Sequence, residues 1–560
     1  MRKIIILFFF VLGLQQVVGQ TTTSSIKGVV KNGKLEALPA ASVLAVHTPS
    51  GTKYTAVSNG DGRFNLLNMR VGGPYVVTVS FVGSQSQKIN DVYLELGKAS
   101  NLDFILEDES QQLNEVKVVA KNKVFSSNRT GGETTIGRRE LLTLPTISRS
   151  ADDFTRLEPS ASGGSFGGRN NKFNNYSLNG SIFNNPFGLD AATPGGQTGA
   201  QPISLDAIDQ IQVATAPFDV TLSGFTGASV NAVTKSGTNE FHGTTYGFFR
   251  NDAMTGNKVN GQKIVVPNLE QTQAGFSIGG PLVKDKLFFF ANFEVDDRSD
   301  AGSNVVANDG NGITGVNESR VLASDLNFVS SELGKLGYNT GSYQGFTHYS
   351  KSNKGIVKLD WNINDNHKFA LIYNFLDASK DKPAHPTAIR RRGPDFNTMQ
   401  FANSGYQINN ELSSVLIELN SKFSETVTNK LQAGYSHFND FRNPFSAPSP
   451  VISITKDGSP YIIAGHEPFS INNKLDQKVI QITDNLNIIK GDHTYTLGFS
   501  FEKFQFQNSF NLKGYGFDVF GSVDMNGFRT NLTNGYYATA FADAQSTFNS
   551  RNQNAAGTDG

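Results

Sequence analysis

Apolar and polar residues alternate along several long segments in the second half of the chain. In residues 493–506, for example, Tyr495, Leu497, Phe499 and Phe501 are separated by mainly polar positions. Alternation with a period of two predicts a β-strand that has one apolar and one polar face. The same pattern recurs in residues 287–295, 357–361, 369–375, 415–419 and 431–435.

The connections between these predicted strands fall into two length classes. Four are tight and polar, and three are long. The tight ones are residues 283–286, 362–366, 421–425 and 490–492, and the long ones are roughly residues 296–353, 377–410 and 439–474. Long loops are uncommon in soluble domains unless they are functional, and a soluble sheet would turn its apolar face into a core. Short turns on one edge and long loops on the other are typical of an outer-membrane barrel, so residues 239–560 predict the N-terminal part of an antiparallel transmembrane β-barrel.

Composition excludes several other classes of protein. The chain has 560 residues, a formal net charge of zero and no cysteine. Zero net charge gives no reason to expect a nucleic-acid partner, and the lack of cysteine excludes disulfides, thiolate metal sites and a cysteine nucleophile. No histidine is followed three residues later by glutamate, and no phosphate-binding loop that ends in Gly-Lys-Ser/Thr is present. We therefore expect no catalytic residues, no metal site and no cofactor.

The N-terminus has the pattern of a secretory signal peptide at residues 1–19. Arg2 and Lys3 precede an apolar run at residues 4–14, and small or compact residues at positions 17–19 precede a cleavage point near Gln20. An N-terminal anchor helix is the alternative, but the run is shorter than the roughly 20 residues that span a bilayer. We therefore expect an exported protein.

Two regions lie between the signal peptide and the predicted barrel. Residues 24–107 contain short strands separated by turns such as residues 59–62, which predicts a small β-domain; that turn lacks the spacing of a calcium loop. Residues 121–237 predict a mixed domain, with helices at residues 138–144 and 150–158 and strands at residues 175–180 and 208–213. Residues 113–120 between the two regions are β-prone and could also form a strand of the mixed domain.

Ordered motifs in this chain resemble those of TonB-dependent outer-membrane receptors of the Oar-like branch, of the Bacteroidetes type. They are residues 178–180 (Leu-Asn-Gly), 208–213 (Ile-Asp-Gln-Ile-Gln-Val), 227–239 (Gly-Ala-Ser-Val-Asn-Ala-Val-Thr-Lys-Ser-Gly-Thr-Asn), 279–282 (Gly-Gly-Pro-Leu) and 286–290 (Lys-Leu-Phe-Phe-Phe). Residues 26–30 (Ile-Lys-Gly-Val-Val) and 59–64 (Asn-Gly-Asp-Gly-Arg-Phe) resemble a carboxypeptidase-regulatory-like β-sandwich. Residues 113–119 resemble a TonB box.

The resemblance implies a mainly β fold: a β-sandwich, a mixed α/β plug and a transmembrane β-barrel. It implies a receptor in the outer membrane of a Gram-negative bacterium, in contact with lipid and lipopolysaccharide, that binds an unknown ligand at extracellular loops and imports it past the plug. The segment that couples to TonB and its energising inner-membrane complex would be Glu115, Val116, Lys117, Val118 and Val119. Arg169, Asn179 and Gly180 would belong to a ligand-facing plug apex.

An outer-membrane adhesion or structural protein without transport is the alternative function. It would need neither a plug nor a TonB box, so the order of these motifs favours the receptor. The cargo has no specific signature, and Arg390, Arg391 and Arg392 fit either an anionic ligand or a solvated basic loop. Within the first long loop, residues 321–336 have helical spacing and end at Gly337.

The strand count suggests that the barrel is incomplete in this sequence. A lumen that holds a plug belongs to barrels of about 22 strands. At the spacing of successive predicted hairpins along this sequence, about eleven hairpins would need roughly 700 residues, whereas about 320 residues follow Asn239. An open barrel would leave strand edges unpaired in lipid. We therefore expect an N-terminal fragment with about nine or ten strands.

Overall fold

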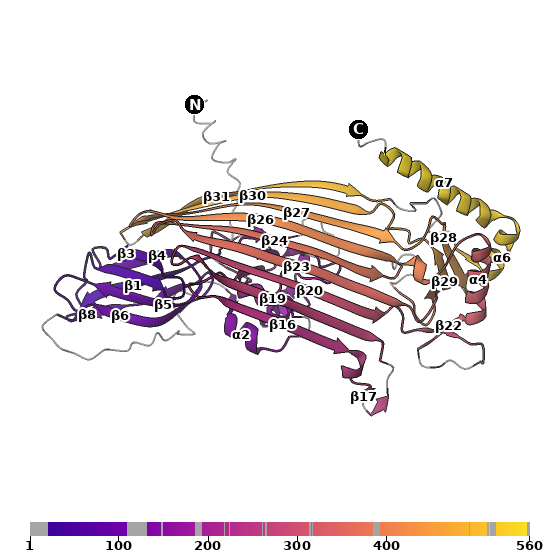
Figure 1. The fold of residues 1–560 in the computed structure, drawn as a ribbon, viewed down its shortest axis with the longest axis horizontal. Helices are drawn as coiled ribbons and strands as arrows, with labels where there is room; N and C mark the ends of the chain where they lie inside the picture. Colours follow the sequence, from indigo (N-terminus) through magenta and orange to yellow (C-terminus); the bar gives the residue numbers. More distant parts are fainter. Residues whose placement is uncertain are drawn as a thin grey trace.

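The computed structural model is mainly β (Figure 1). It describes residues 21–108, 132–146, 149–184, 187, 193–217, 219–222, 224–259, 261–263, 266–312, 315, 317–384, 393–491, 493–511, 514–515 and 522–556. The predicted signal peptide, the segment 113–120 and Arg390 to Arg392 lie outside the described residues.

A nine-stranded antiparallel sheet forms the long wall of the molecule (Figure 1). Its strands pair in chain order: β16 (His242–Asn251), β19 (Leu269–Val283), β20 (Leu287–Ala301), β23 (Thr347–Asn362), β24 (His367–Lys382), β26 (Tyr406–Ser424), β27 (Val427–Pro444), β30 (Lys474–Lys490) and β31 (His493–Ser509). Among the described residues, the edge strands β16 and β31 do not pair with each other, so the sheet is open. Three of the four tight turns occur where the sequence predicted them, and the one predicted at residues 421–425 lies at residues 425–426, because β26 continues to Ser424.

The two faces of this wall differ in polarity. Apolar side chains such as Val415, Ile417 and Leu497 are exposed on one face. The other face buries many polar side chains, among them Gln273, Asn292, Asn374, Asn410, Ser414, Ser436, Gln477 and Thr483. A soluble sheet with one solvent-exposed face buries its apolar side chains and exposes its polar ones. The wall does the reverse: its outer face is apolar and its inner face is polar.

The N-terminal unit, called here the sandwich (residues 24–108), has two four-stranded sheets over one core. One sheet contains β1 (Ser24–Asn32), β4 (Arg63–Met69), β7 (Ala99–Asn101) and β8 (Phe104–Leu106); the other has the order β3 (Thr52–Val57), β2 (Ser42–His47), β5 (Gly72–Ser80) and β6 (Gln87–Leu94). Both sheets contribute to the buried cluster, for example Ile26 and Val77. Strands β6 and β7 were not predicted. In β6, Asp91 has a positive φ of 57° and the pairing with β5 shifts register, so its buried residues lose the period of two.

The inner domain (residues 132–234) lies against the polar face of the wall. Its five-stranded sheet has the order β13 (Ser181–Ile182), β12 (Asn175–Leu178), β15 (Ser229–Thr234), β14 (Ile208–Ala214) and β9 (Glu133–Ile136). Its helices are α2 (Arg138–Thr143) and α3 (Asp152–Thr155), and short pieces β10 (Ala161–Ser162), β11 (Ser165–Phe166), η1 (Asn171–Phe173) and η2 (Leu205–Ala207) complete it. Helix α3 is shorter than the predicted 150–158, because the amides of Leu157 and Glu158 bond three residues back in tight turns.

One apolar cluster joins the inner domain to the wall. Ile211 and Val230 of the inner domain belong to the same buried cluster as Phe290, Leu412 and Phe438 of the wall. These wall residues are among the apolar exceptions to its polar inner face. Apolar burial, the main favourable term in folding, therefore holds the two parts together.

The long loops fold into a separate unit at the far end of the wall, called here the loop subdomain. It contains β21 (Val306–Asn308), β22 (Glu318–Leu322), α4 (Ala323–Lys335), η4 (Ala402–Ser404), α6 (Met525–Thr533), α7 (Tyr536–Ala556) and a four-stranded sheet, β25 (Met399–Gln400), β29 (Ser459–Gly465), β28 (Val451–Lys456) and β32 (Ser522–Asp524). Short elements η3 (Asp252–Met254), β17 (Lys258–Val259) and β18 (Gln262–Lys263) follow β16. No described helix is long and apolar enough to cross a membrane.

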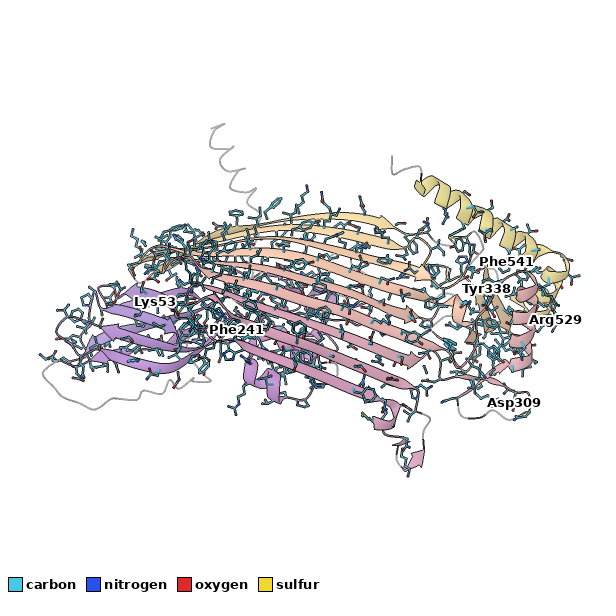
Figure 2. All side chains as sticks on the ribbon, in the orientation of Figure 1. Lys53, Phe241, Asp309, Tyr338, Arg529 and Phe541 are labelled. Atoms are coloured by element: carbon cyan, nitrogen blue, oxygen red, sulfur yellow. The ribbon has the colours of Figure 1, made fainter. Side chains whose placement is uncertain are left out.

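Helix α4 packs its apolar side into this unit. Leu326, Val329 and Leu333 are fully buried in a cluster that also contains Tyr461 and Phe528 from other loops. Arg529 lies over the Phe328 ring, and Tyr338 contacts Phe541 (Figure 2). Three long loops and the residues that follow β31 therefore share one core.

We predict that Leu326→Ala destabilises the loop subdomain by about 2–5 kcal/mol, because it leaves a cavity in this core. Hydrogen exchange of the α4 amides should accelerate, while exchange in β24 stays the same. Ser324→Ala, at an exposed position of α4, is the matched control and should change little. Equal exchange in both variants would contradict a shared core.

Candidate functional site: the cavity and contacts inside the wall

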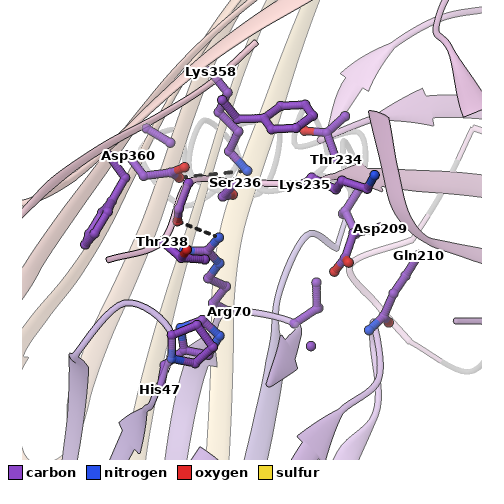
Figure 3. A pocket seen from close by; sticks show the side chains of 18 of the residues that line it. His47, Arg70, Asp209, Gln210, Thr234, Lys235, Ser236, Thr238, Lys358 and Asp360 are labelled. Carbon is purple, nitrogen blue, oxygen red and sulfur yellow. Dashed lines mark hydrogen bonds and ion pairs between the residues drawn. The ribbon is translucent and has the colours of Figure 1, made fainter. Parts of the chain in front are cut away.

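A cavity of about 840 Å³ lies where the sandwich, the inner domain and the wall meet (Figure 3). Each part supplies charged or titratable side chains to its lining. The sandwich supplies His47 and Arg70, the inner domain supplies Asp209 and Lys235, and the wall supplies Lys358, Asp360 and Glu418. The cavity lining therefore contains charges of both signs.

Ion pairs hold several of these charges in place. Lys235 Nζ lies 3.1 Å from Asp206 Oδ1, and Lys358 Nζ lies 3.8 Å from Asp360 Oδ1. Arg70 Nη2 donates to the carbonyl of Gly237 at 3.4 Å, which joins the sandwich to the start of the barrel segment (Figure 3). No group of carboxylates and histidines among the described residues has the spacing of a metal site.

Burial shifts two titratable groups that line the cavity. It lowers the pKa of His47 to about 3, with a smaller contribution from the positive charge of Arg70. His47 Nδ1 and Ser50 Oγ share a hydrogen bond of 2.6 Å. Burial also raises the pKa of the Asp209 carboxyl, against the opposing effect of nearby cations, first Arg70. Neutral His47 is the stable form here at physiological pH, which suits a structural role.

A buried carboxylate joins the inner domain to the wall. Glu294 of β20 is fully buried and lies 2.9 Å from Lys354 Nζ of β23. It accepts hydrogen bonds from Tyr246 at 2.6 Å, from Gln273 at 2.9 Å and, across the interface, from Ser204 of the inner domain at 2.7 Å. Each oxygen of Glu294 thus has partners, as a charge in a buried site requires.

Two of the predicted ligand residues lie at the contact with the wall. Gln432 Nε2 donates to the Asn179 carbonyl at 3.3 Å, and Gln481 Nε2 donates to the Gly180 carbonyl at 2.7 Å. Asn179 is buried, bonds Thr234 and lines the cavity beside the sandwich. Arg169 is exposed in the glycine-rich part of the inner domain. The structure therefore does not bring Arg169 together with Asn179 and Gly180, and their role in binding stays a prediction.

A second cavity, of about 570 Å³, lies between the inner domain and the wall strands β19, β20 and β23. Arg149 and Arg156 line it on the inner-domain side, and Asp296 and Lys354 line it on the wall side. Arg149 stacks on the Phe248 ring at 3.7 Å. These residues were not predicted, because isolated arginines and strand carboxylates have no distinctive spacing in the sequence.

A family model described as an outer membrane beta barrel domain matches residues 233–559, and a carboxypeptidase regulatory-like domain matches residues 25–107. The first match covers more than half of the chain. The chain belongs to the outer membrane beta barrel family. The inverted polarity of the wall is what membership of this family requires.

Two curated relatives are TonB-dependent proteins. The chain is 30% identical over 157 residues to the TonB-dependent transporter Oar of Myxococcus xanthus, a match that covers 26% of this chain and 14% of that protein. It is 32% identical over 117 residues to the TonB-dependent receptor SusC of Bacteroides thetaiotaomicron, covering 21% and 10% respectively. The predicted resemblance to Oar-like TonB-dependent receptors with a carboxypeptidase regulatory-like domain is thereby confirmed. The chain spans only a small part of either relative.

Solved structures with a similar arrangement include the outer membrane transporter YddB of Escherichia coli, with 12% identity and a TM-score of 0.44, covering 66% of this chain and 48% of that one. The siderophore receptor PirA of Acinetobacter baumannii has 15% identity and a TM-score of 0.41, covering 69% and 49%. The chain thus spans about half of each of these structures.

We predict that Lys354→Met lowers the free energy of unfolding by about 3–5 kcal/mol, because it leaves the Glu294 charge buried without its cation. Urea unfolding in detergent measures the change. Lys351→Met, at an exposed position of the same strand, is the control. The double variant Lys354→Met/Glu294→Gln should recover part of the loss, and no recovery would contradict the pairing.

Proposed function

We propose that this chain is part of a TonB-dependent outer-membrane receptor, which binds a ligand on the side of the long loops and imports it past the inner domain. The inner domain would then act as the plug, residues 121–237, and the wall would be part of a transmembrane barrel, residues 239–560. Residues 24–107 would be the carboxypeptidase-regulatory-like domain on the side of the tight turns. The named relatives, both TonB-dependent, support this assignment.

The observation that carries the proposal is that the wall is apolar on its outer face and polar on its inner face, and that the inner domain occupies the inner face. Exposed apolar residues such as Leu497 and Ile417 suit contact with lipid hydrocarbon, since a barrel in lipid meets no water on that face. The inner face is occupied by a domain bound through Glu294, Gln432 and Gln481. An unobstructed pore would leave this lumen free. A filled lumen instead requires an energised or ligand-driven rearrangement before anything passes.

The ligand would meet the loop subdomain first and then the outer side of the inner domain. Arg149 and Arg156 line the 570 Å³ cavity there, and exposed Arg169 lies in the same domain. We assign Asn179 and Gly180 a weaker part in binding, since their carbonyls already bond the wall. Outer-membrane lipid and lipopolysaccharide would surround the wall.

Coupling to TonB would use the segment Glu115 to Val119. When an extended segment adds as a strand to the edge of a partner's sheet, backbone hydrogen bonds supply most of the affinity. A substitution that removes a backbone N–H should therefore weaken binding more than one that changes only the side chain. We predict that Val118→Pro lowers affinity for the purified periplasmic domain of TonB by at least about tenfold, the equivalent of about 1.4 kcal/mol.

Val118→Thr, which keeps the N–H and the β-branched shape, is the matched control and should bind like the parent chain. Isothermal titration or a pull-down with the TonB domain gives the readout. Deletion of residues 113–120 should abolish uptake and leave ligand binding intact. Unchanged TonB binding by Val118→Pro would refute the assignment of the coupling segment.

The outward face gives a separate prediction about the membrane. Leu497→Arg places a charge on the exposed apolar face of β31 and should lower stability by about 2–4 kcal/mol if the residue lies near the bilayer centre. Thr496→Arg, its neighbour on the other face of the strand, is the control and should cost less. Folding yield into lipid vesicles measures both, and equal yields would argue against a lipid-facing wall.

A further inference from the structure

The sandwich touches all four tight turns of the wall. The Asn239 amide, beside the β19–β20 turn residue Asp285, donates to the Pro49 carbonyl at 2.7 Å. Residues at each of the other turns bond the sandwich directly. Asn362 Nδ2 donates to Thr52 Oγ1 at 3.0 Å, Lys422 Nζ donates to Thr55 O and Oγ1 at 2.8 Å, and Asn59 Nδ2 donates to the Gly491 carbonyl at 3.3 Å. The sandwich therefore lies across the turn end of the sheet (Figure 1).

A second set of contacts fixes the sandwich to the inner domain. Gln210 of β14 forms a two-point clamp: the Leu96 amide donates to its Oε1 at 2.8 Å, and its Nε2 donates to the Leu94 carbonyl at 3.0 Å. Beside this clamp, Val71 and Leu96 of the sandwich cover Val233 of β15. This apolar contact is small.

The segment just before β1 extends the contact into the lumen. Thr22 Oγ1 donates to Glu418 Oε2 at 2.7 Å, and Lys430 Nζ donates to Thr22 Oγ1 at 2.5 Å. Asn231 of the inner domain also donates to the Thr21 carbonyl. The wall, the inner domain and the segment that leads into the sandwich thus meet at a partly buried group of polar side chains.

These contacts border the 840 Å³ cavity on the turn side. His47, Arg70, Val71 and Leu94 of the sandwich form part of its lining, opposite Asp209 and Lys358. A solute that passes the inner domain toward the turn end would enter this cavity and meet the sandwich.

The chemistry of the interface suits reversible docking. Most contacts are hydrogen bonds, some of them charge-assisted, such as those of Lys422 with Thr55 and of Thr22 with Glu418. Only three apolar residues form the buried cluster between the sandwich and the inner domain. Interfaces between domains of one chain that are polar and modest in size allow relative motion. A permanent interface would bury a larger apolar area.

We propose that the sandwich is a gate on the turn side of the receptor, which closes the 840 Å³ cavity when docked and opens it by leaving as a unit. The proposal rests on the proposed function, since the cavity matters only if a solute crosses the wall. It assigns the carboxypeptidase-regulatory-like domain a mechanical role in the import path. The inner domain then controls passage at one end of the cavity, and the sandwich controls it at the other.

The absence of cysteine from the chain allows a direct test by thiol labelling. Val233→Cys places the reporter against Val71 and Leu96, at the edge of the cavity. Under the gate proposal, a maleimide too bulky to enter the docked cavity reacts there only after the sandwich moves. Val230→Cys, on the same strand but buried in the cluster shared with the wall, is the control for opening of the inner domain. Both are measured in the full chain reconstituted in lipid vesicles.

We predict that Asn362→Ala, Lys422→Ala and Gln210→Ala, combined, raise the labelling rate at Cys-substituted position 233 at least tenfold and leave position 230 unchanged. Equal increases at both positions would mean that the inner domain opens with the sandwich, which overturns the proposal. An unchanged rate at position 233 would overturn it as well.

A disulfide lock provides the converse experiment. Pro49→Cys with Asn239→Cys, positions whose backbones share a hydrogen bond of 2.7 Å, joins the sandwich to the barrel segment beside the β19–β20 turn and should abolish labelling at position 233 until a reductant is added. Val29→Cys with Arg63→Cys, at paired positions of β1 and β4, forms a disulfide within the sandwich and should leave labelling at position 233 unchanged. Labelling that persists in the locked chain would overturn the gate. None of these readouts depends on TonB or on transport, so failure of the gate is distinguishable from failure of the proposed function.

Discussion

The polarity of the wall is the constraint on which the rest of the structure depends. A sheet whose outer face meets hydrocarbon must place its polar side chains on the inner face, where water or protein has to satisfy them. Here protein does so: Ser204 bonds Glu294, and the carbonyls of Asn179 and Gly180 accept from wall glutamines. Hydrogen bonds between the inner domain and the wall therefore satisfy polar groups of both parts.

This constraint also explains which parts of the fold could be predicted from the sequence. Alternation along the wall is a local pattern, and the tight turns at residues 283–286 and 362–366 interrupt it sharply, so strands and turns were both found. The loop subdomain was not found beyond its helix. Its sheet pairs β25 with β29 and β28 with β32, segments of two to seven residues that are far apart in the chain. Pieces that short have no readable period, and their pairing depends on the wall holding the loop ends together.

The candidate site was predictable only in part for a related reason. The motifs around Asn179 and Asp209 indicated which domain is involved, and both residues line the cavity beside the sandwich. The residues that join the three parts, such as Gln210, Thr52 and Asn362, are ordinary polar residues in turns and strands. Their significance comes from pairing across domain boundaries, and a single sequence contains no signal for such pairs.

The strengths of these contacts differ in a way that bears on mechanism. The inner domain meets the wall through a large apolar cluster and through the buried Glu294–Lys354 ion pair, to which Ser204 bonds. The sandwich meets both through hydrogen bonds, neutral and charge-assisted, and through a cluster of three apolar residues. Because a buried charge without its partner costs several kcal/mol and a hydrogen bond between neutral groups about 1 kcal/mol, we expect the sandwich to separate more readily than the inner domain. Under the proposed function, work supplied from the periplasmic side would be needed at the inner domain, while the sandwich would respond to solute or to strain in the chain that joins it to the inner domain.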